Sequence, residues 1–179
     1  MIWRRGPLSI VVLAGAIIIV GVLLWQQLAV DSTRPAGGSA DSAALLALTL
    51  PDAAGKQETL AQWKGKVLIV NFWATWCEPC KEEMPRFIKL QDEYGAKGLQ
   101  FVGIAIDQPD KVRAFAKDIG LNYPTLVGGY GAIELSKTLG NNVGALPFTV
   151  VLDRAGAVVH TQLGPLKDPQ LLSIIRQLT

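Results

Sequence analysis

Two cysteines separated by two residues are the feature of this sequence with the clearest chemical potential. Cys77 and Cys80 lie in the stretch NFWATWCEPCKEEMP, residues 71–85, and they are the only cysteines in the chain. Such a pair can form a structural disulfide, bind a metal or act as a redox-active dithiol. An apolar run of strand type precedes the pair and a segment with helical periodicity follows it, so both cysteines are predicted at a strand-to-helix junction.

A redox role follows from the predicted position of Cys77 at the N-terminus of a helix. The unpaired N–H groups and the dipole at such an end favour a thiolate, and they can lower the pKa of a thiol below its usual value of about 8.5. Cys80 lies three residues later, on the same face of the first turn, and Pro79 is compatible with a helix start. Cys77 is therefore predicted to attack a partner's disulfide, and Cys80 to resolve the mixed disulfide.

The other two uses of the cysteine pair have weaker support. A disulfide that closes so short a loop contributes only about 2 kcal/mol. Zinc usually takes four ligands, and His160 is the only histidine in the chain. Two thiolates can hold Cu(I), so a copper chaperone remains an alternative. Otherwise no metal site is predicted, and no cofactor is expected beyond a redox-active Cys77–Cys80 disulfide.

Two acidic residues beside the cysteines are predicted to tune their chemistry. Glu78 places a negative charge next to Cys77 and opposes its ionisation, so we predict a reductant and not an oxidant. Glu83 lies three residues after Cys80 on the same predicted helix face. If partly buried, it can exchange a proton with Cys80, whereas a surface location would make it an ordinary solvated acid. The predicted catalytic residues are Cys77, Cys80 and Glu83.

A second segment, NVGALPFTVVLD at residues 142–153, is predicted to contribute to substrate binding. Pro147 directly precedes a predicted central strand, which is a place for a cis peptide bond, although an ordinary strand-initiating proline is the alternative. Backbone groups beside it can pair with an extended substrate segment. The predicted substrate-binding residues are Trp76, Glu78, Pro79, Leu146 and Pro147.

The remaining pattern predicts an α/β sandwich with a mixed sheet. Within residues 45–55, leucines alternate at 46, 48 and 50 and are followed by turn residues, which indicates a short N-terminal strand or hairpin. Further strands are predicted at 67–73, 99–106, 121–127, 148–152 and 158–163, and helices at 78–94, 109–119, 133–139 and 168–178. Asp168 is the expected N-cap of the last helix.

The N-terminal segment predicts a membrane anchor. Residues 8–25, LSIVVLAGAIIIVGVLLW, are almost wholly apolar, close to the roughly 20 residues that a spanning helix needs. This run exceeds the about 7–15 apolar residues of a signal peptide, which favours an uncleaved anchor over a cleaved signal. Arg4 and Arg5 precede it, so the C-terminal domain is predicted to face the periplasm or another extracytoplasmic side of the inner membrane.

The predicted organisation has a cytoplasmic N-terminus at residues 1–5, an anchor at 6–30, a flexible Gly/Ser-rich linker at 31–44 and one domain at 45–179. The net charge is only +2, and no basic patch accompanies the aromatic residues. Nucleic-acid binding is therefore not expected.

NFWATWCEPC together with LPFTVVLD resembles the thioredoxin-like TlpA/ResA group of membrane-anchored thiol–disulfide oxidoreductases. The resemblance covers residues 45–179 and fits the anchor. It implies a thioredoxin-like fold, a mixed central sheet flanked by helices, with an N-terminal β-hairpin and a central insertion near LNYPTL. The group's paired cysteines match Cys77 and Cys80, its cis-proline matches Pro147, and its acid matches Glu83.

The resemblance also implies partners. Members of this group reduce disulfides of exported client proteins, including the haem-site cysteines of apocytochrome c, and receive electrons from a transmembrane thiol reductase. A thiol oxidase or isomerase of the same fold is an alternative that a redox potential would distinguish. A thioredoxin-like peroxidase usually lacks the closely spaced second cysteine.

Overall fold

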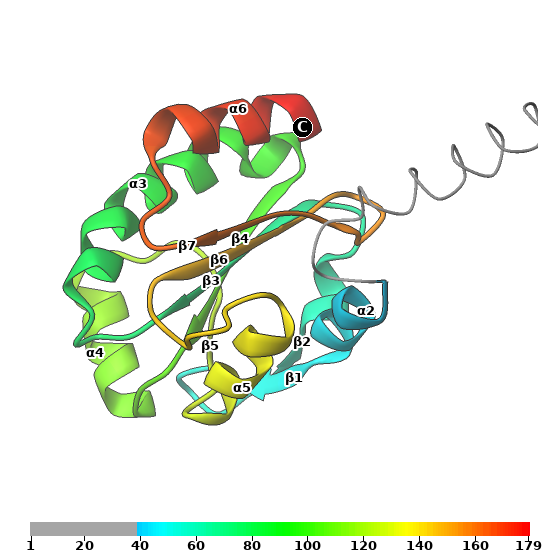
Figure 1. The fold of residues 1–179 in the computed structure, drawn as a ribbon. Helices are drawn as coiled ribbons and strands as arrows, with labels where there is room; N and C mark the ends of the chain where they lie inside the picture. The colour runs from blue at the N-terminus through cyan, green and yellow to red at the C-terminus, as the bar shows by residue number, and fades with distance from the viewer. Residues whose placement is uncertain (1–38) are drawn as a thin grey trace, which may run out of the picture. The chain divides into compact units, whose positions relative to one another are not determined.

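The central element of the fold is a five-stranded mixed sheet with the order β5-β4-β3-β6-β7. Figure 1 shows this computed structural model, which describes residues 39–179. The strands are β3 (Val67–Trp73), β4 (Leu99–Ala105), β5 (Thr125–Val127), β6 (Phe148–Leu152) and β7 (Val158–Leu163). β3 runs parallel to β4 and antiparallel to β6, so the strand that leads to the cysteines lies in the middle of the sheet.

Helices cover both faces of this sheet (Figure 1). They are α2 (Ser39–Ala47), α3 (Glu78–Tyr94), α4 (Pro109–Asp118), α5 (Gly131–Thr138) and α6 (Asp168–Leu178), with short 3-10 turns at Leu60–Trp63 and Gly95–Lys97. The predicted α/β sandwich with a mixed sheet is confirmed for these residues, and the predicted helix at 78–94 has the bounds of α3.

The alternation of side chains along β3 explains why both faces are covered. All seven residues of β3 are buried. Val67, Ile69 and Trp73 pack into one apolar cluster with residues of α3, α4 and α6. Leu68, Val70 and Phe72 point the other way and pack with residues of α2 and α5. A continuous apolar strand therefore forms two cores at once, because successive side chains alternate across the sheet.

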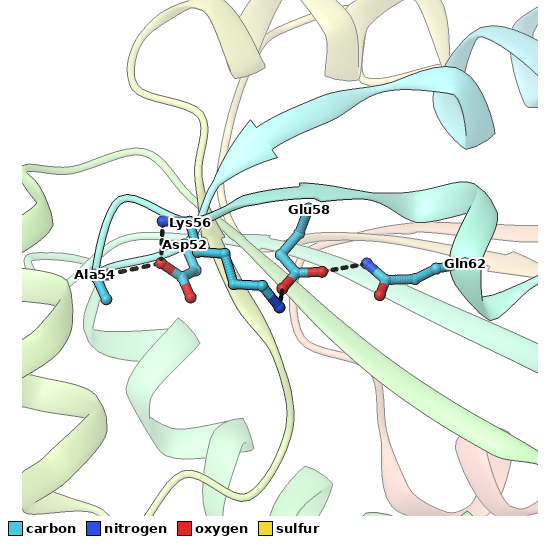
Figure 2. Close-up of polar contacts among 5 residues, drawn as sticks. All are labelled: Asp52, Ala54, Lys56, Glu58 and Gln62. Carbon is cyan, nitrogen blue, oxygen red and sulfur yellow. Dashed lines mark hydrogen bonds and ion pairs between the residues drawn. The ribbon is translucent and has the colours of Figure 1, made fainter.

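The predicted N-terminal hairpin is present as β1 (Thr49–Pro51) and β2 (Gln57–Thr59), an antiparallel pair. Asp52 closes its turn, since its Oδ1 accepts hydrogen bonds from the backbone N–H groups of Ala54 at 2.8 Å and Lys56 at 2.9 Å (Figure 2). Glu58 contacts both Lys56 and Gln62. These contacts show why a short polar sequence forms a defined turn.

Two local predictions are wrong. The segment from Ser39 to Ala44, predicted as part of a flexible linker, belongs to helix α2, and the strand expected from residue 45 begins only at Thr49. Alanine and leucine are strong helix formers, and Leu45 is fully buried in the cluster that contains residues of α5. Helix packing therefore outweighs the alternation of leucines that suggested a strand.

The expected cap of the last helix is also displaced by one residue. Lys167 is the N-cap of α6 and makes no side-chain capping bond. Asp168 lies in the first turn, where its carboxylate faces the positive end of the helix dipole and lies 3.4 Å from Nε of Arg86. The acid therefore stabilises the helix start through charge and not as a cap.

The predicted anchor at residues 6–30 lies outside the described residues. Within 39–179, no helix is both long enough and apolar enough to cross a membrane.

Candidate active site

The two cysteines form a disulfide at the junction between β3 and α3. Their sulfur atoms are 2.05 Å apart and their Cα atoms 5.3 Å apart. Cys77 is the N-cap residue of α3, and Pro79 lies in its first turn, as predicted. Cys77 is 6% exposed, whereas Cys80 is fully buried. An incoming thiolate therefore reaches the sulfur of Cys77 first.

The loop that leads into Cys77 is fixed by an acid from the neighbouring strand end. Asp107 Oδ2 accepts hydrogen bonds from the Thr75 hydroxyl and, at 3.2 Å, from the Thr75 backbone N–H. Burial would raise the pKa of Asp107, but these bonds and one from the backbone N–H of Gln108 outweigh it and hold the pKa below its usual value. Asp107 was missed in the sequence analysis, although it follows β4 at the same sheet edge where β3 ends.

Replacing Asp107 with asparagine should loosen this loop. We expect the free energy of unfolding at pH 7 to fall by about 1–2 kcal/mol, because hydrogen bonds to a carboxylate are lost. Since the pKa of Asp107 is lowered by folding, its contribution is present at neutral pH and disappears as the pH falls through that pKa, below 3.8. Urea unfolding at several pH values measures the difference.

Asp110→Asn is the matched control, because the Asp110 side chain is 90% exposed and pairs only with Arg113 among the contacts described. An equal loss of stability in both variants would contradict the role of Asp107.

Glu83 lies in the second turn of α3, on the buried face of the helix, and is 8% exposed. It is therefore not a solvated surface acid. Its Oε1 accepts a hydrogen bond from Asn71 Nδ2 at 2.9 Å, and its Oε2 accepts one from the backbone N–H of Leu166 at 3.2 Å. Burial raises the pKa of Glu83 to about 7, although both hydrogen bonds favour the charged form. This acid can therefore gain and lose a proton near neutral pH.

Asn71 positions this carboxyl group from β3. Its Nδ2 also donates to the Thr149 hydroxyl at 3.1 Å, and Asn71 is paired with Thr149 in the register of β3 and β6. No function was predicted for Asn71 from the sequence. The signal was a single polar residue in the otherwise apolar strand VLIVNFW, because buried polar groups in such a strand need partners.

The predicted substrate-binding residues lie around a surface groove beside Cys77. The Leu146–Pro147 peptide bond is cis. The groove has a volume of about 410 Å³ and is lined by Trp76, Cys77, Glu78, Pro79, Ile133, Gly144, Ala145 and Leu146. We call it the cysteine groove. Four of the five predicted residues line it; Pro147 does not, and Ile133, Gly144 and Ala145 were not predicted.

The wall of the cysteine groove opposite the helix is held by Asn141. This fully buried side chain donates to the carbonyl of Ala145 at 2.9 Å and accepts from the Ala145 N–H at 3.2 Å. Asn141 Nδ2 also donates to the Ser136 hydroxyl at 3.0 Å. The segment before Pro147 is therefore tied to the end of α5 and presents a defined surface to a substrate.

The two tryptophans of the motif have different surroundings. Trp76 is 63% exposed, as expected for a docking surface. Trp73 is fully buried, and its indole N–H donates to the Thr125 hydroxyl at 3.2 Å. Gly103 makes room for this bond, because a Cβ there would lie 2.7 Å from the Thr125 hydroxyl oxygen. Trp73 is thus a core residue.

Glu78 is more weakly coupled to Cys77 than predicted. Its side chain is 70% exposed, and its Oε2 lies 2.5 Å from Nζ of Lys81. Solvent and the lysine both reduce the effect of its charge on a neighbouring thiolate. Glu78 therefore gives only weak support for a reductant.

The Redoxin family matches residues 36–176 of the chain. The chain belongs to the Redoxin family. A relative of this redoxin, the thiol–disulfide oxidoreductase ResA of Bacillus thuringiensis (strain Al Hakam), is 31% identical over 179 aligned residues, covering 95% of this chain and 92% of that protein. The thioredoxin-like protein YneN of Bacillus subtilis is 35% identical over 127 residues, covering 69% and 71%.

Solved structures show the same fold. A thiol:disulfide interchange protein from Chlorobium tepidum superposes with a TM-score of 0.66 and 30% identity, over 73% of this redoxin and 92% of that chain. A second solved structure, of a protein from Neisseria meningitidis, superposes with a TM-score of 0.64 and 30% identity, over 73% of this redoxin and 86% of that chain. The predicted thioredoxin-like α/β fold is confirmed for the described residues, and this redoxin is a thiol–disulfide oxidoreductase with a Cys-X-X-Cys pair.

Proposed function

We propose that this redoxin is an exported, membrane-tethered reductase of disulfides in client proteins. The observation that carries the proposal is the unequal exposure of the two sulfurs, with Cys77 at the surface of an apolar groove and Cys80 buried behind it. That asymmetry suits an enzyme in which one sulfur meets the client and the other completes the exchange.

The proposed reaction has two steps. In the reduced enzyme, the Cys77 thiolate attacks one sulfur of a client disulfide, so that a mixed disulfide forms and the second client sulfur leaves as a thiolate and takes up a proton. Cys80, once deprotonated, attacks the Cys77 sulfur and releases the first client sulfur, which is protonated in turn. Two electrons pass to the client, and the Cys77–Cys80 disulfide remains. A dithiol donor must then reduce it again.

Glu83 is proposed to accept the Cys80 proton. It lies one helical turn from Cys80 on α3, is buried, and has a pKa of about 7. A general base works best when its pKa lies near the working pH. Asn71 and the Leu166 N–H hold the carboxyl group in place, so the proton acceptor is positioned before the client arrives.

The partners and location are proposed from the N-terminal sequence and the family resemblance. Residues 6–30 would anchor the chain in the inner membrane, with the domain on the periplasmic or extracytoplasmic side. Apocytochrome c is a candidate client, and a transmembrane thiol reductase is the proposed electron donor. The redox-active disulfide supplies the chemistry without a bound cofactor, and no nucleic acid takes part.

The experiment is to trap the client with Cys80→Ser in the cell that makes this protein. Without the resolving thiol, we expect mixed disulfides through Cys77 to accumulate, to disappear on reduction and to be absent in Cys77→Ser. Mass spectrometry then identifies the attached protein, and an attached apocytochrome c supports the maturation role. No adduct with any exported protein would contradict the proposal.

The redox potential of the Cys77–Cys80 pair tests the direction of transfer. A reductase should lie nearer to thioredoxin, at about −270 mV, than to a strong oxidant, at about −120 mV. A value at the oxidising end would identify an oxidase or isomerase.

A further inference from the structure

Trp76 separates two grooves. On one side lies the cysteine groove. On the other lies a second groove of about 540 Å³, which Trp76 shares with Asp107, Pro109, Lys111, Gly129 and Tyr130 among its lining residues. We call it the Tyr130 groove. Most of its lining residues lie at the ends of β4 and β5 and at the starts of α4 and α5. The groove therefore adjoins the reactive site without containing a cysteine.

Exposed apolar side chains gather around these two grooves. Tyr130 is 83% exposed, Val143 72% and Trp76 63%, and these are the three most exposed large apolar side chains in residues 39–179. Tyr130 and Trp76 line the Tyr130 groove, and Val143 directly precedes a residue of the cysteine groove. A concentration of such side chains at one place indicates a binding surface for a polypeptide or another apolar ligand.

The floor of the Tyr130 groove is fixed in advance. Asp107 holds Thr75, the residue before Trp76. The backbone N–H groups of Gly128 and Gly129 both donate to the carbonyl of Ala105, at 3.0 and 3.2 Å. A preformed surface loses little conformational entropy on binding, so even a short segment could gain affinity from it.

The accessible charge of the Tyr130 groove is positive, which favours a ligand that carries an acidic group. The Asp107 side chain is only 5% exposed, whereas that of Lys111 is 59% exposed and its Nζ lies 3.9 Å from Asp107 Oδ1. Asp107 is therefore buried and bonded within the protein, whereas Lys111 presents its charge to the solvent. An incoming carboxylate would meet Lys111 with a modest, salt-dependent attraction.

We propose that the Tyr130 groove binds the client polypeptide itself, taking a large apolar side chain, preferably aromatic, that flanks the reactive cysteine and has an acidic residue beside it. This deepens the proposed function and rests on it. The two grooves are continuous through Trp76, which lines both. A client joined to Cys77 must lie in the cysteine groove and can reach the second groove by crossing only this side chain. The redoxin would then select clients by the sequence on one side of the reactive cysteine.

The test uses the reduced full-length chain and synthetic peptides of about ten residues. Each peptide carries one cysteine, activated as a mixed disulfide with thionitrobenzoate, and one phenylalanine that is moved along a Gly-Ser background on both sides of the cysteine. The readout is the rate constant of each phenylalanine peptide divided by that of the phenylalanine-free peptide, within the same enzyme variant. We expect a gain of about tenfold at one or two neighbouring positions on one side only.

Tyr130→Ser should reduce this ratio to nearly one. This variant is expected to fold normally, because the Tyr130 side chain is mostly exposed. Val159→Ser is the matched control, since it removes an exposed apolar side chain from β7, outside both grooves, and it should keep the full ratio. At the favoured position, an aspartate next to the phenylalanine should increase the rate over a lysine there, and Lys111→Gln should abolish that difference.

A ratio near one at every position in the wild type, or a gain that persists in Tyr130→Ser, would overturn the inference while the proposed function stands. If the wild type shows no preference between aspartate and lysine beside the phenylalanine, the proposed acidic residue of the client is refuted and the apolar part of the inference stands. Failure of the proposed function looks different, because the wild type would then leave insulin disulfides intact.

Discussion

Replacing both Cys77 and Cys80 with serine is expected to lower the rate of insulin reduction by this redoxin on the order of a thousandfold or more. A serine hydroxyl is not ionised at neutral pH and cannot form a disulfide, so neither proposed step can occur. The measurement is the initial rate of insulin precipitation with dithiothreitol as the electron donor, corrected for the rate with dithiothreitol alone.

The single variants separate the two proposed steps. Cys77→Ser should be as inactive as the double variant, because the remaining thiol is buried. Cys80→Ser should still release one thionitrobenzoate equivalent from an activated peptide in a single turnover, and then stop as a stable mixed disulfide. Since both substitutions remove the same disulfide, any difference between them reports the position of each sulfur. A double serine variant that reduces insulin at the wild-type rate would refute the proposed chemistry.

Replacing Glu83 with glutamine should flatten the pH dependence of stability. The pKa of Glu83 rises from 4.5 to about 7 on folding. At about 1.4 kcal/mol for each pKa unit, this shift corresponds to about 3 kcal/mol. Because the folded-state pKa is the higher one, this contribution is fully present below pH 4.5 and is lost as the pH rises through about 7.

Denaturant unfolding of the oxidised protein between pH 4.5 and pH 8.5 measures this effect. The wild type should lose up to about 3 kcal/mol more than Glu83→Gln over this range. Glu82→Gln is the control, because Glu82 is the exposed neighbour on the same helix, and it should follow the wild-type curve. If the free energy of unfolding changes with pH in the same way for the wild type and Glu83→Gln, burial does not raise the pKa of Glu83.

The same variant tests the chemical role of Glu83. In the wild type, the resolution step by Cys80 should accelerate through an inflection near pH 7, where Glu83 becomes able to accept a proton. In Glu83→Gln, that inflection should disappear and the step should slow by on the order of tenfold to a hundredfold. A purely structural role would change stability and leave the inflection in place.

The elements that local sequence determines were predictable. The apolar run of β3, the proline near the start of α3 and the spacing of the cysteines all act over a few residues, and the structure has them in the predicted places. Most failures involve contacts between distant segments. Asp107 meets Thr75 across 32 positions of sequence and Asn71 meets Thr149 across 78. Contacts between residues so far apart in the sequence produce no periodic pattern from which they could be predicted.

Two other misses show how context overrides a pattern. The alternating leucines at the N-terminal edge suggested a strand, but burial of Leu45 against the sheet selects a helix. Glu78 was expected to act on Cys77 because it is adjacent, yet Lys81 pairs with it on the helix surface. Charge effects depend on exposure and on neighbours one turn away, which a motif alone does not specify.

The contact between Glu83 and the Leu166 N–H links the carboxyl terminus to the centre of the molecule. Leu166 stands just before α6, so a single amide couples the seating of the final helix to an ionisable group near the disulfide. Trimming the chain before that amide would admit solvent to the carboxylate and return its titration toward that of a free glutamate. The segment that leads into α6 therefore helps to keep the Glu83 carboxyl group buried and its pKa raised.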